Sequence, residues 1–136
     1  MSNASRKLAR SHMKRLVRAN PAYRTIGVLP KISETLIDFA EPILDIAGED
    51  ELRCRVALDL ATLVWNGLVE ARPMDEIVAA LEQVFGAGAG ARRTAEALAE
   101  RKQELFADDQ RFIVAVDLYQ EDGEFRVNAA YRLTPQ

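Results

Sequence analysis

The chain has 136 residues, of which 49% are hydrophobic and 29% are charged, a composition typical of one folded domain with its own core. Its single cysteine, Cys54, excludes an intramolecular disulfide and a cysteine-rich metal site, and no apolar run approaches the roughly 18 residues of a membrane span. We therefore expect a cytoplasmic protein with no cofactor and no membrane contact.

Charge is distributed unevenly along the chain. Residues 1–31 carry eight lysines and arginines and no acidic residue, a net charge of +8, whereas residues 32–136 carry ten basic and 21 acidic residues, a net charge of −11. The two values sum to the −3 of the whole chain. We interpret residues 1–30 as a basic arm and linker, and residues 31–136 as a single helical domain with a C-terminal β-hairpin.

The basic arm has three open interpretations. It binds nucleic acid by displacing counterions from phosphates, it lies on an acidic surface of its own chain or of a second copy, or it is a solvated tail. Tyr23 is its only aromatic residue, so a base-stacking platform is not indicated. The side chains expected to contact a polyanion or an acidic surface are Arg6, Lys7, Arg10, Lys14, Arg15, Arg18 and Arg24.

The first helix of the domain is predicted over about 31–47, where apolar residues recur at steps of three and four. Pro42 lies inside this pattern, and a proline there removes a hydrogen bond and clashes with the preceding turn. We therefore expect Pro42 to kink this helix or to split it in two. Gly48 suits the C-terminal cap.

A second helix is predicted over about 51–70, with Asp50 as its N-cap. Between Val56 and Val69 this segment is apolar almost all round, which is typical of a helix in the centre of a fold. The middle of the core is expected to consist of Leu60, Leu63, Val64 and Trp65.

One narrow polar stripe interrupts the central helix. Its members are Arg55, Asp59, Thr62, Asn66 and Glu70. A buried carboxylate at Asp59 would need a partner, and Arg55 lies one turn away. Either the stripe is the solvated side of the helix, or its first four residues line a polar pocket or a partner surface.

Two further helices follow. Pro73 at the first helical position, with Asp75 and Glu76 after it, is typical of a helix start, and the last helix is predicted over about 91–107. We expect Lys102 to lay its stem on apolar surface and to keep its charge in water. Asp108 and Asp109, at the end of that helix, are interpreted as turn residues rather than as cation ligands.

The stretch VFGAGAGARR at 84–93 contains three closely spaced glycines. A dinucleotide-binding turn follows a strand and has the spacing G-x-G-x-x-G, whereas these glycines follow a predicted helix and alternate with alanine. We interpret the stretch as a helix cap and a helix–helix link. The less favoured alternative is an anion site in which Arg92, Arg93 and free backbone N–H groups hold a phosphate.

The C-terminus predicts an antiparallel β-hairpin, with strands over about 111–120 and 125–133 around the turn signal Asp122-Gly123. The expected apolar face pairs Leu118 with Val127, Val116 with Ala129, Val114 with Tyr131 and Phe112 with Leu133, beyond the closing pair Glu121 and Glu124. The opposite, outer face carries Ile113, Asp117, Tyr119, Arg126, Asn128 and Arg132. Cross-strand pairing explains its polar residues, and a ligand site is the alternative.

The expected fold is mainly α (α+β), with four to five helices around the central 51–70 helix and the C-terminal hairpin. The one histidine, His12, lies in the arm, so no Ser-His-Asp set has a core-anchored histidine, and we lean against an enzyme. Open sheet edges favour a homodimer. The function expected first is protein–protein interaction or self-association, then nucleic-acid association, and third a small-ligand or enzymatic site around Asp59 and the outer hairpin face.

Overall fold

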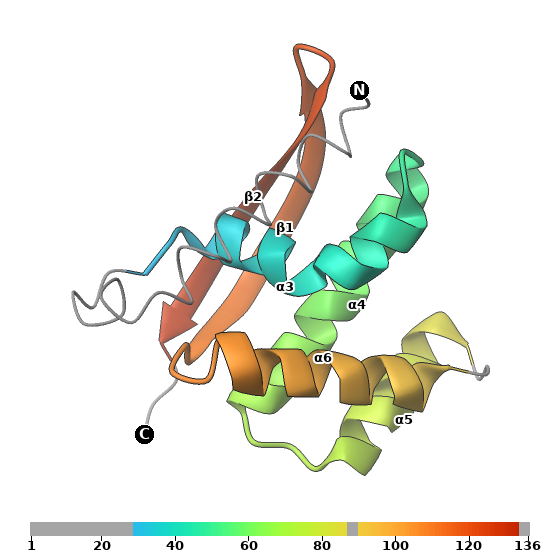
Figure 1. The fold of residues 1–136 in the computed structure, drawn as a ribbon, viewed down its shortest axis with the longest axis vertical. Helices are drawn as coiled ribbons and strands as arrows, with labels where there is room; N and C mark the ends of the chain where they lie inside the picture. The colour runs from blue at the N-terminus through green and yellow to red at the C-terminus, as the bar shows by residue number, and fades with distance from the viewer. Residues whose placement is uncertain (1–28, 87–89, 134–136) are drawn as a thin grey trace.

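The computed structural model describes residues 29–86 and 90–133. Its elements, in chain order, are α3 (Ile32–Ala47), α4 (Glu51–Val69), α5 (Met74–Phe85), α6 (Ala91–Leu105), β1 (Arg111–Glu121) and β2 (Glu124–Leu133). The predicted class, a mainly helical α+β fold with a C-terminal antiparallel hairpin, is confirmed. Figure 1 shows the hairpin turn at one end of the molecule and α5 and α6 at the other.

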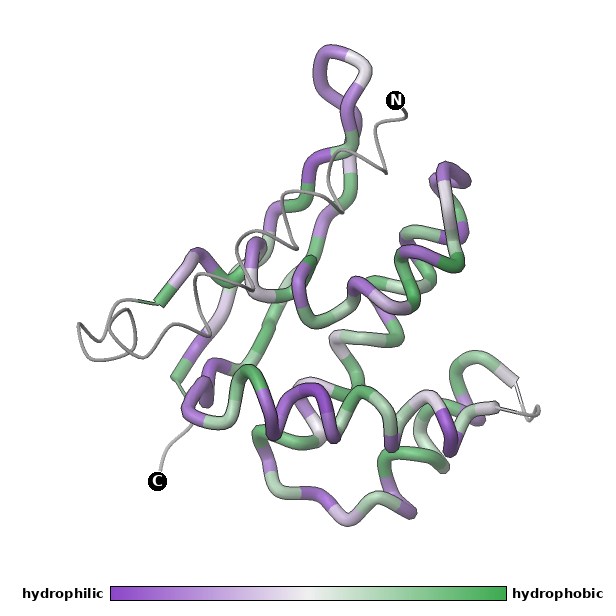
Figure 2. Tube along the Cα trace, viewed as in Figure 1, coloured by the Kyte–Doolittle hydropathy of each residue, from purple (hydrophilic) through white to green (hydrophobic). Residues whose placement is uncertain are grey.

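The helix α4 is the centre of this arrangement, because it contacts α3, α5, α6 and β1. Asp50 caps it as predicted, accepting a hydrogen bond from the Arg53 N–H at 3.0 Å. Val64 and Trp65 are fully buried, while Leu60 and Leu63 are half-buried at the edge of the core. Figure 2 shows that both protruding tips, the hairpin turn and the connection between α3 and α4, are hydrophilic.

Pro42 lies inside α3, which is one continuous helix, so the alternative that this proline splits the segment in two is wrong. A proline has no N–H, and the carbonyl four residues earlier, that of Asp38, loses its helical donor. Arg101 of α6 supplies the replacement, because its Nε and Nη2 donate to the Asp38 carbonyl at 3.2 and 2.7 Å. Gly48 caps the end of α3 with a φ of 66°.

The contacts of α5 depend on one glycine of α4. A Cβ on Gly67 would lie 2.7 Å from Cγ1 of Ile77, so the absence of a side chain lets α5 approach α4 closely. Pro73 is the N-cap of α5 and not its first helical residue. Ile77, Val78 and Leu81 of α5 are buried, whereas Val84 and Phe85 at its end are exposed.

The hairpin register is confirmed next to the turn and wrong beyond it. Asp122 and Gly123 both have positive φ, and the pairs from Glu121–Glu124 to Val116–Ala129 form as expected. A β-bulge then interrupts the ladder between Ile113 and Ala115, so that Ile113 pairs with Tyr131 and Phe112 pairs with Arg132. One extra residue, Val114, stands on β1 without a partner on β2.

The bulge reverses which side chains of β1 face the helices. Ile113, which we expected on the outer face, is 3% exposed, whereas Val114 is 52% exposed. Phe112 leaves the expected apolar face and stacks with Arg132, whose guanidinium lies 4.2 Å from the ring centre. Because the alternation shifts by one residue at the bulge, Arg111 also turns inward and is buried.

Candidate functional site

The polar stripe of α4 binds the backbone of β1. Asn66 donates from Nδ2 to the Ile113 carbonyl and accepts the Ile113 N–H at Oδ1, both at 2.8 Å. Arg55 donates from Nη2 to the Leu118 carbonyl at 3.0 Å, and Trp65 donates from Nε1 to the Arg111 carbonyl at 2.6 Å. Side chains of α4 therefore cover the edge of β1 that faces away from β2.

The other two residues of the candidate pocket behave differently. The Thr62 hydroxyl donates to the Leu58 carbonyl of its own helix at 2.7 Å, and Asp59 is exposed. Arg55 also lies 3.8 Å from Glu51, in an exposed i,i+4 ion pair. The structure thus brings Arg55 and Asn66 to one strand edge, and it does not direct the side chains of Thr62 and Asp59 there.

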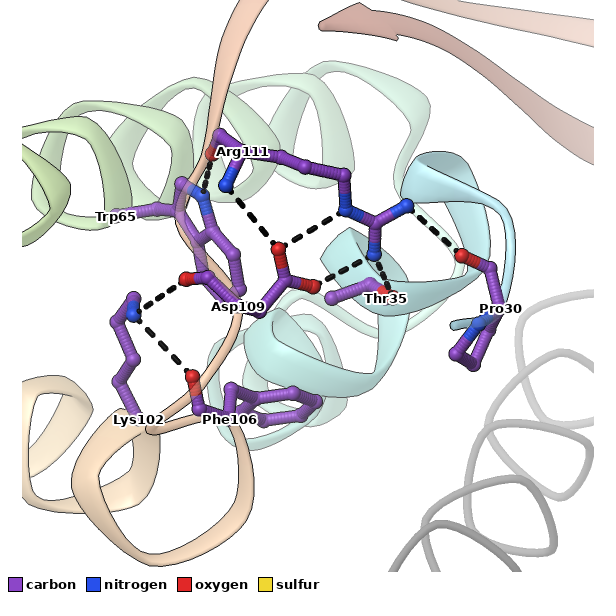
Figure 3. Close-up of polar contacts among 7 residues, drawn as sticks. All are labelled: Pro30, Thr35, Trp65, Lys102, Phe106, Asp109 and Arg111. Carbon is purple, nitrogen blue, oxygen red and sulfur yellow. Dashed lines mark hydrogen bonds and ion pairs between the residues drawn. The ribbon is translucent and has the colours of Figure 1, made fainter. Parts of the chain in front are cut away.

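A buried polar cluster, made of Asp109, Arg111, Thr35 and Lys102, joins the start of β1 to α3 and α6 (Figure 3). Arg111 and Asp109 form an ion pair in which Nη2 lies 2.6 Å from Oδ2 and Nε lies 2.9 Å from Oδ1. The same guanidinium donates to the Thr35 hydroxyl at 3.1 Å and to the Pro30 carbonyl at 2.9 Å. Both charged side chains are about 95% buried, and this degree of burial is tolerated because each is paired.

Lys102 forms the α6 side of the cluster, and the expectation that its charge stays in water is wrong. The residue is 6% exposed. Its ammonium group donates to the carbonyls of Phe106 and Asp109 at 3.2 and 2.9 Å and lies 4.6 Å from the centre of the Trp65 ring. The helix ends at Leu105, and the chain folds back so that two carbonyls beyond it surround this ammonium group.

Burial lowers the pKa of Lys102, and the nearby carboxylates of Asp109 and Asp108 oppose this effect. Between the lowered pKa of the folded protein and the ordinary value of 10.5 in the unfolded chain, the unfolded chain binds more protons. The free energy of unfolding that is linked to Lys102 therefore rises with pH in this window.

Replacing Lys102 with methionine should remove this pH dependence of the free energy of unfolding and keep much of the volume of the lysine side chain. We expect the free energy of unfolding of the wild type, minus that of Lys102→Met, to increase from about pH 8 to about pH 10, as measured by urea unfolding. Lys31→Met, which removes an exposed lysine, controls for the loss of one charge. A difference that stays flat or falls with pH would contradict the lowering of the Lys102 pKa by burial.

The candidate anion site at the start of α6 contains both signs of charge. Arg92 lies 2.6 Å from Asp75, and this hydrogen-bonded carboxylate raises the pKa of Arg92. Arg93 is exposed. A surface cleft beside both arginines is also lined by Glu96 and Glu100, so acidic side chains accompany the two guanidinium groups.

The remaining candidate residues add little to the candidate site. The basic side chains from Arg6 to Arg24 lie outside the described residues. Cys54 is buried and its thiol donates to the Gly48 carbonyl at 3.4 Å. Within residues 29–86 and 90–133, no group of three or more His, Cys, Asp or Glu side chains could hold a metal ion, and no helix is long and apolar enough to cross a membrane.

The edge of the sheet formed by β2 differs from the edge formed by β1, which side chains of α4 cover. The Ile113 and Leu118 backbone groups point toward α4, so the backbone groups of their partners, Tyr131 and Val127, point away from β1. Between residues 29–33 and residues 128–131 of β2 lies an open cleft of about 510 Å³. Tyr131 and Leu29, which both line this cleft, are about half exposed.

Comparisons with known proteins identify no relative of this chain. No protein-family model matches the chain, and searches of curated proteins and of solved structures find no significant match.

Proposed function

We propose that this protein acts through protein–protein interaction or self-association, with the open edge of β2 as its contact surface. One observation carries the proposal: α4 covers one edge of the hairpin, while no described segment donates a backbone hydrogen bond to the other edge or accepts one from it. An open strand edge is a template on which another chain adds a strand.

Two further observations support an interaction role. Large apolar side chains at the base of the hairpin are exposed: Val114 by 52%, Tyr131 by 49% and Leu133 by 74%. The polar groups that would make the best catalytic candidates, in the α4 stripe and in the buried cluster, bind the protein's own backbone or one another. These contacts stabilise the fold and favour a binding module over an enzyme.

Site-specific photo-crosslinking in cells tests this function. A photoreactive amino acid at Asn128, which is exposed on β2, should give covalent protein adducts, whereas the same residue at Asp59, exposed on α4, should give few. Ala129→Pro removes an N–H that points away from β1 and should abolish the adducts without breaking a bond to β1. Equal adducts from both positions, or none from either, would contradict the proposal.

The uneven charge supports a second candidate function, nucleic-acid association through the basic arm. Fluorescence anisotropy of labelled duplex DNA and RNA across a salt series tests it. The logarithm of the affinity should fall with the logarithm of salt by about 0.9 per phosphate contacted. Exchanging Arg6, Lys7 and Arg10 for glutamine should flatten the slope by about 3. Absence of binding at low salt would rule this candidate out.

A further inference from the structure

We propose that the chain which occupies the open edge of β2 is β2 of a second copy, paired antiparallel about a two-fold axis at Asn128. This inference rests on the proposed function and names its partner. Two hairpins would then form one four-stranded sheet. Three features of β2 support it: the direction of its backbone groups, the charges on its outer face and the cleft next to residues 128–131.

The backbone direction limits the registers that are allowed. Backbone groups alternate in direction along a strand, so every second residue from Val127 and Tyr131 has its N–H and C=O pointing away from β1. These residues are Phe125, Val127, Ala129 and Tyr131. In a two-fold antiparallel pair, each of these must face another of them to exchange hydrogen bonds. With the axis at Asn128, Val127 faces Ala129 of the second copy and Phe125 faces its Tyr131, so all four residues find partners.

The outer face distinguishes this register from its neighbours. With the axis at Asn128, Glu124, which lies 3.3 Å from Arg126 of its own strand, also faces Arg132 of the second copy, an attractive pair that occurs twice by symmetry. An axis at Ala129 would instead place Arg126 opposite Arg132, which is repulsive. An axis at Val127 would bring Tyr131 opposite Gly123 in the hairpin turn and shorten the ladder. The sequence of β2 is therefore self-complementary about Asn128 alone among these three positions.

Among the described residues, the part of β2 around Asn128 is also accessible from a cleft. The cleft between residues 29–33 and residues 128–131 lies beside it. Tyr131, whose ring lies 5.2 Å from the Arg111 guanidinium carbon, is still 49% exposed. In the proposed pairing Tyr131 lies opposite Phe125 of the second copy, whose ring is buried in the core of that copy.

Disulfide trapping tests the register directly. In a Cys54→Ser background, Asn128→Cys places each new thiol opposite its own copy at a non-hydrogen-bonded pair, where Cα atoms about 4.5 Å apart suit a disulfide. Ala130→Cys is the matched control, since it is exposed on the same face and its counterpart lies four residues along the strand, about 13 Å away. Mild oxidation should crosslink Asn128→Cys at least tenfold faster than Ala130→Cys.

Light scattering on the full chain supplies the second measurement. The wild type should approach twice 15.2 kDa as concentration rises, and Asn128→Lys should shift it back to the monomer. The new lysine faces its own copy across the axis, while within one protomer it faces Asp117, so the hairpin itself is preserved.

Three results would overturn this inference: a wild-type monomer at every concentration, equal crosslinking of the two cysteine variants, or a dimer that Asn128→Lys leaves intact. A monomer here together with photo-crosslinked adducts of another mass at Asn128 would overturn the inference and leave the proposed function standing.

Discussion

Replacement of Asp109 with alanine should lower the free energy of unfolding by about 3–5 kcal/mol, because it leaves the Arg111 guanidinium buried without its counter-charge. Arg111 is 5% exposed, and three of its N–H groups, including its backbone N–H, donate to the Asp109 carboxylate. The remaining bonds to Thr35 and Pro30 are to neutral acceptors. Urea unfolding followed by circular dichroism measures the change.

Asp108→Ala is the matched control for this variant. Asp108 is adjacent in sequence, has the same charge and is exposed, so its loss should change the free energy of unfolding by no more than about 0.5 kcal/mol. Equal effects from the two substitutions would mean that the ion pair of Arg111 contributes nothing specific to the fold.

Trp65→Ala should destabilise the protein by a similar amount, about 3–5 kcal/mol, through a different mechanism. The Trp65 ring is fully buried, and it makes edge-to-face contacts with Phe39 and Phe106 at centroid distances of 5.1 and 5.8 Å. Its removal leaves a cavity where α3, α4 and the end of α6 meet. It also leaves the Arg111 carbonyl without its indole donor.

The substitution Trp65→Phe separates the effect of the cavity from the effect of the lost hydrogen bond. Phenylalanine keeps an aromatic ring but cannot donate to the Arg111 carbonyl, so about 1–3 kcal/mol should be lost, clearly less than for alanine. Chemical denaturation followed by far-ultraviolet circular dichroism is the measurement, since Trp65 is the one tryptophan of the chain. An alanine variant as stable as the phenylalanine variant would show that the site collapses without a cavity.

The sequence predicted those elements that depend on residues close to one another in the chain. The stripe of α3, the cap at Asp50 and the turn at Asp122-Gly123 each depend on residues within a few positions of one another. The register next to the turn was predictable for the same reason, since the turn fixes it. The bulge at Val114 could not be predicted from the turn, because it turns Ile113 toward the helices and so depends on the packing of β1 on α4.

The buried cluster was missed because its partners come from distant parts of the chain. Arg111 binds Thr35 and Pro30, more than 70 residues earlier, and no periodicity reports such a contact. One local signal was present: Asp109 and Arg111, two residues apart at the start of a strand, have opposite charges and project to one side. The polar stripe of α4 was recognised as a pattern, but its target, the backbone of β1, depends on tertiary structure.

In the proposed pairing through β2, the side chains of α4 that bind β1 would limit the assembly to two copies. Trp65, Asn66 and Arg55 occupy the backbone groups of β1 that a further strand would need. A sheet with two open edges can extend without end into a fibre, whereas one with a single open edge is complete when that edge is filled. In the proposed dimer, α4 would therefore prevent the addition of a further strand to β1. A chain with Asn66 and Arg55 replaced by alanine should form polymers more readily than the wild type.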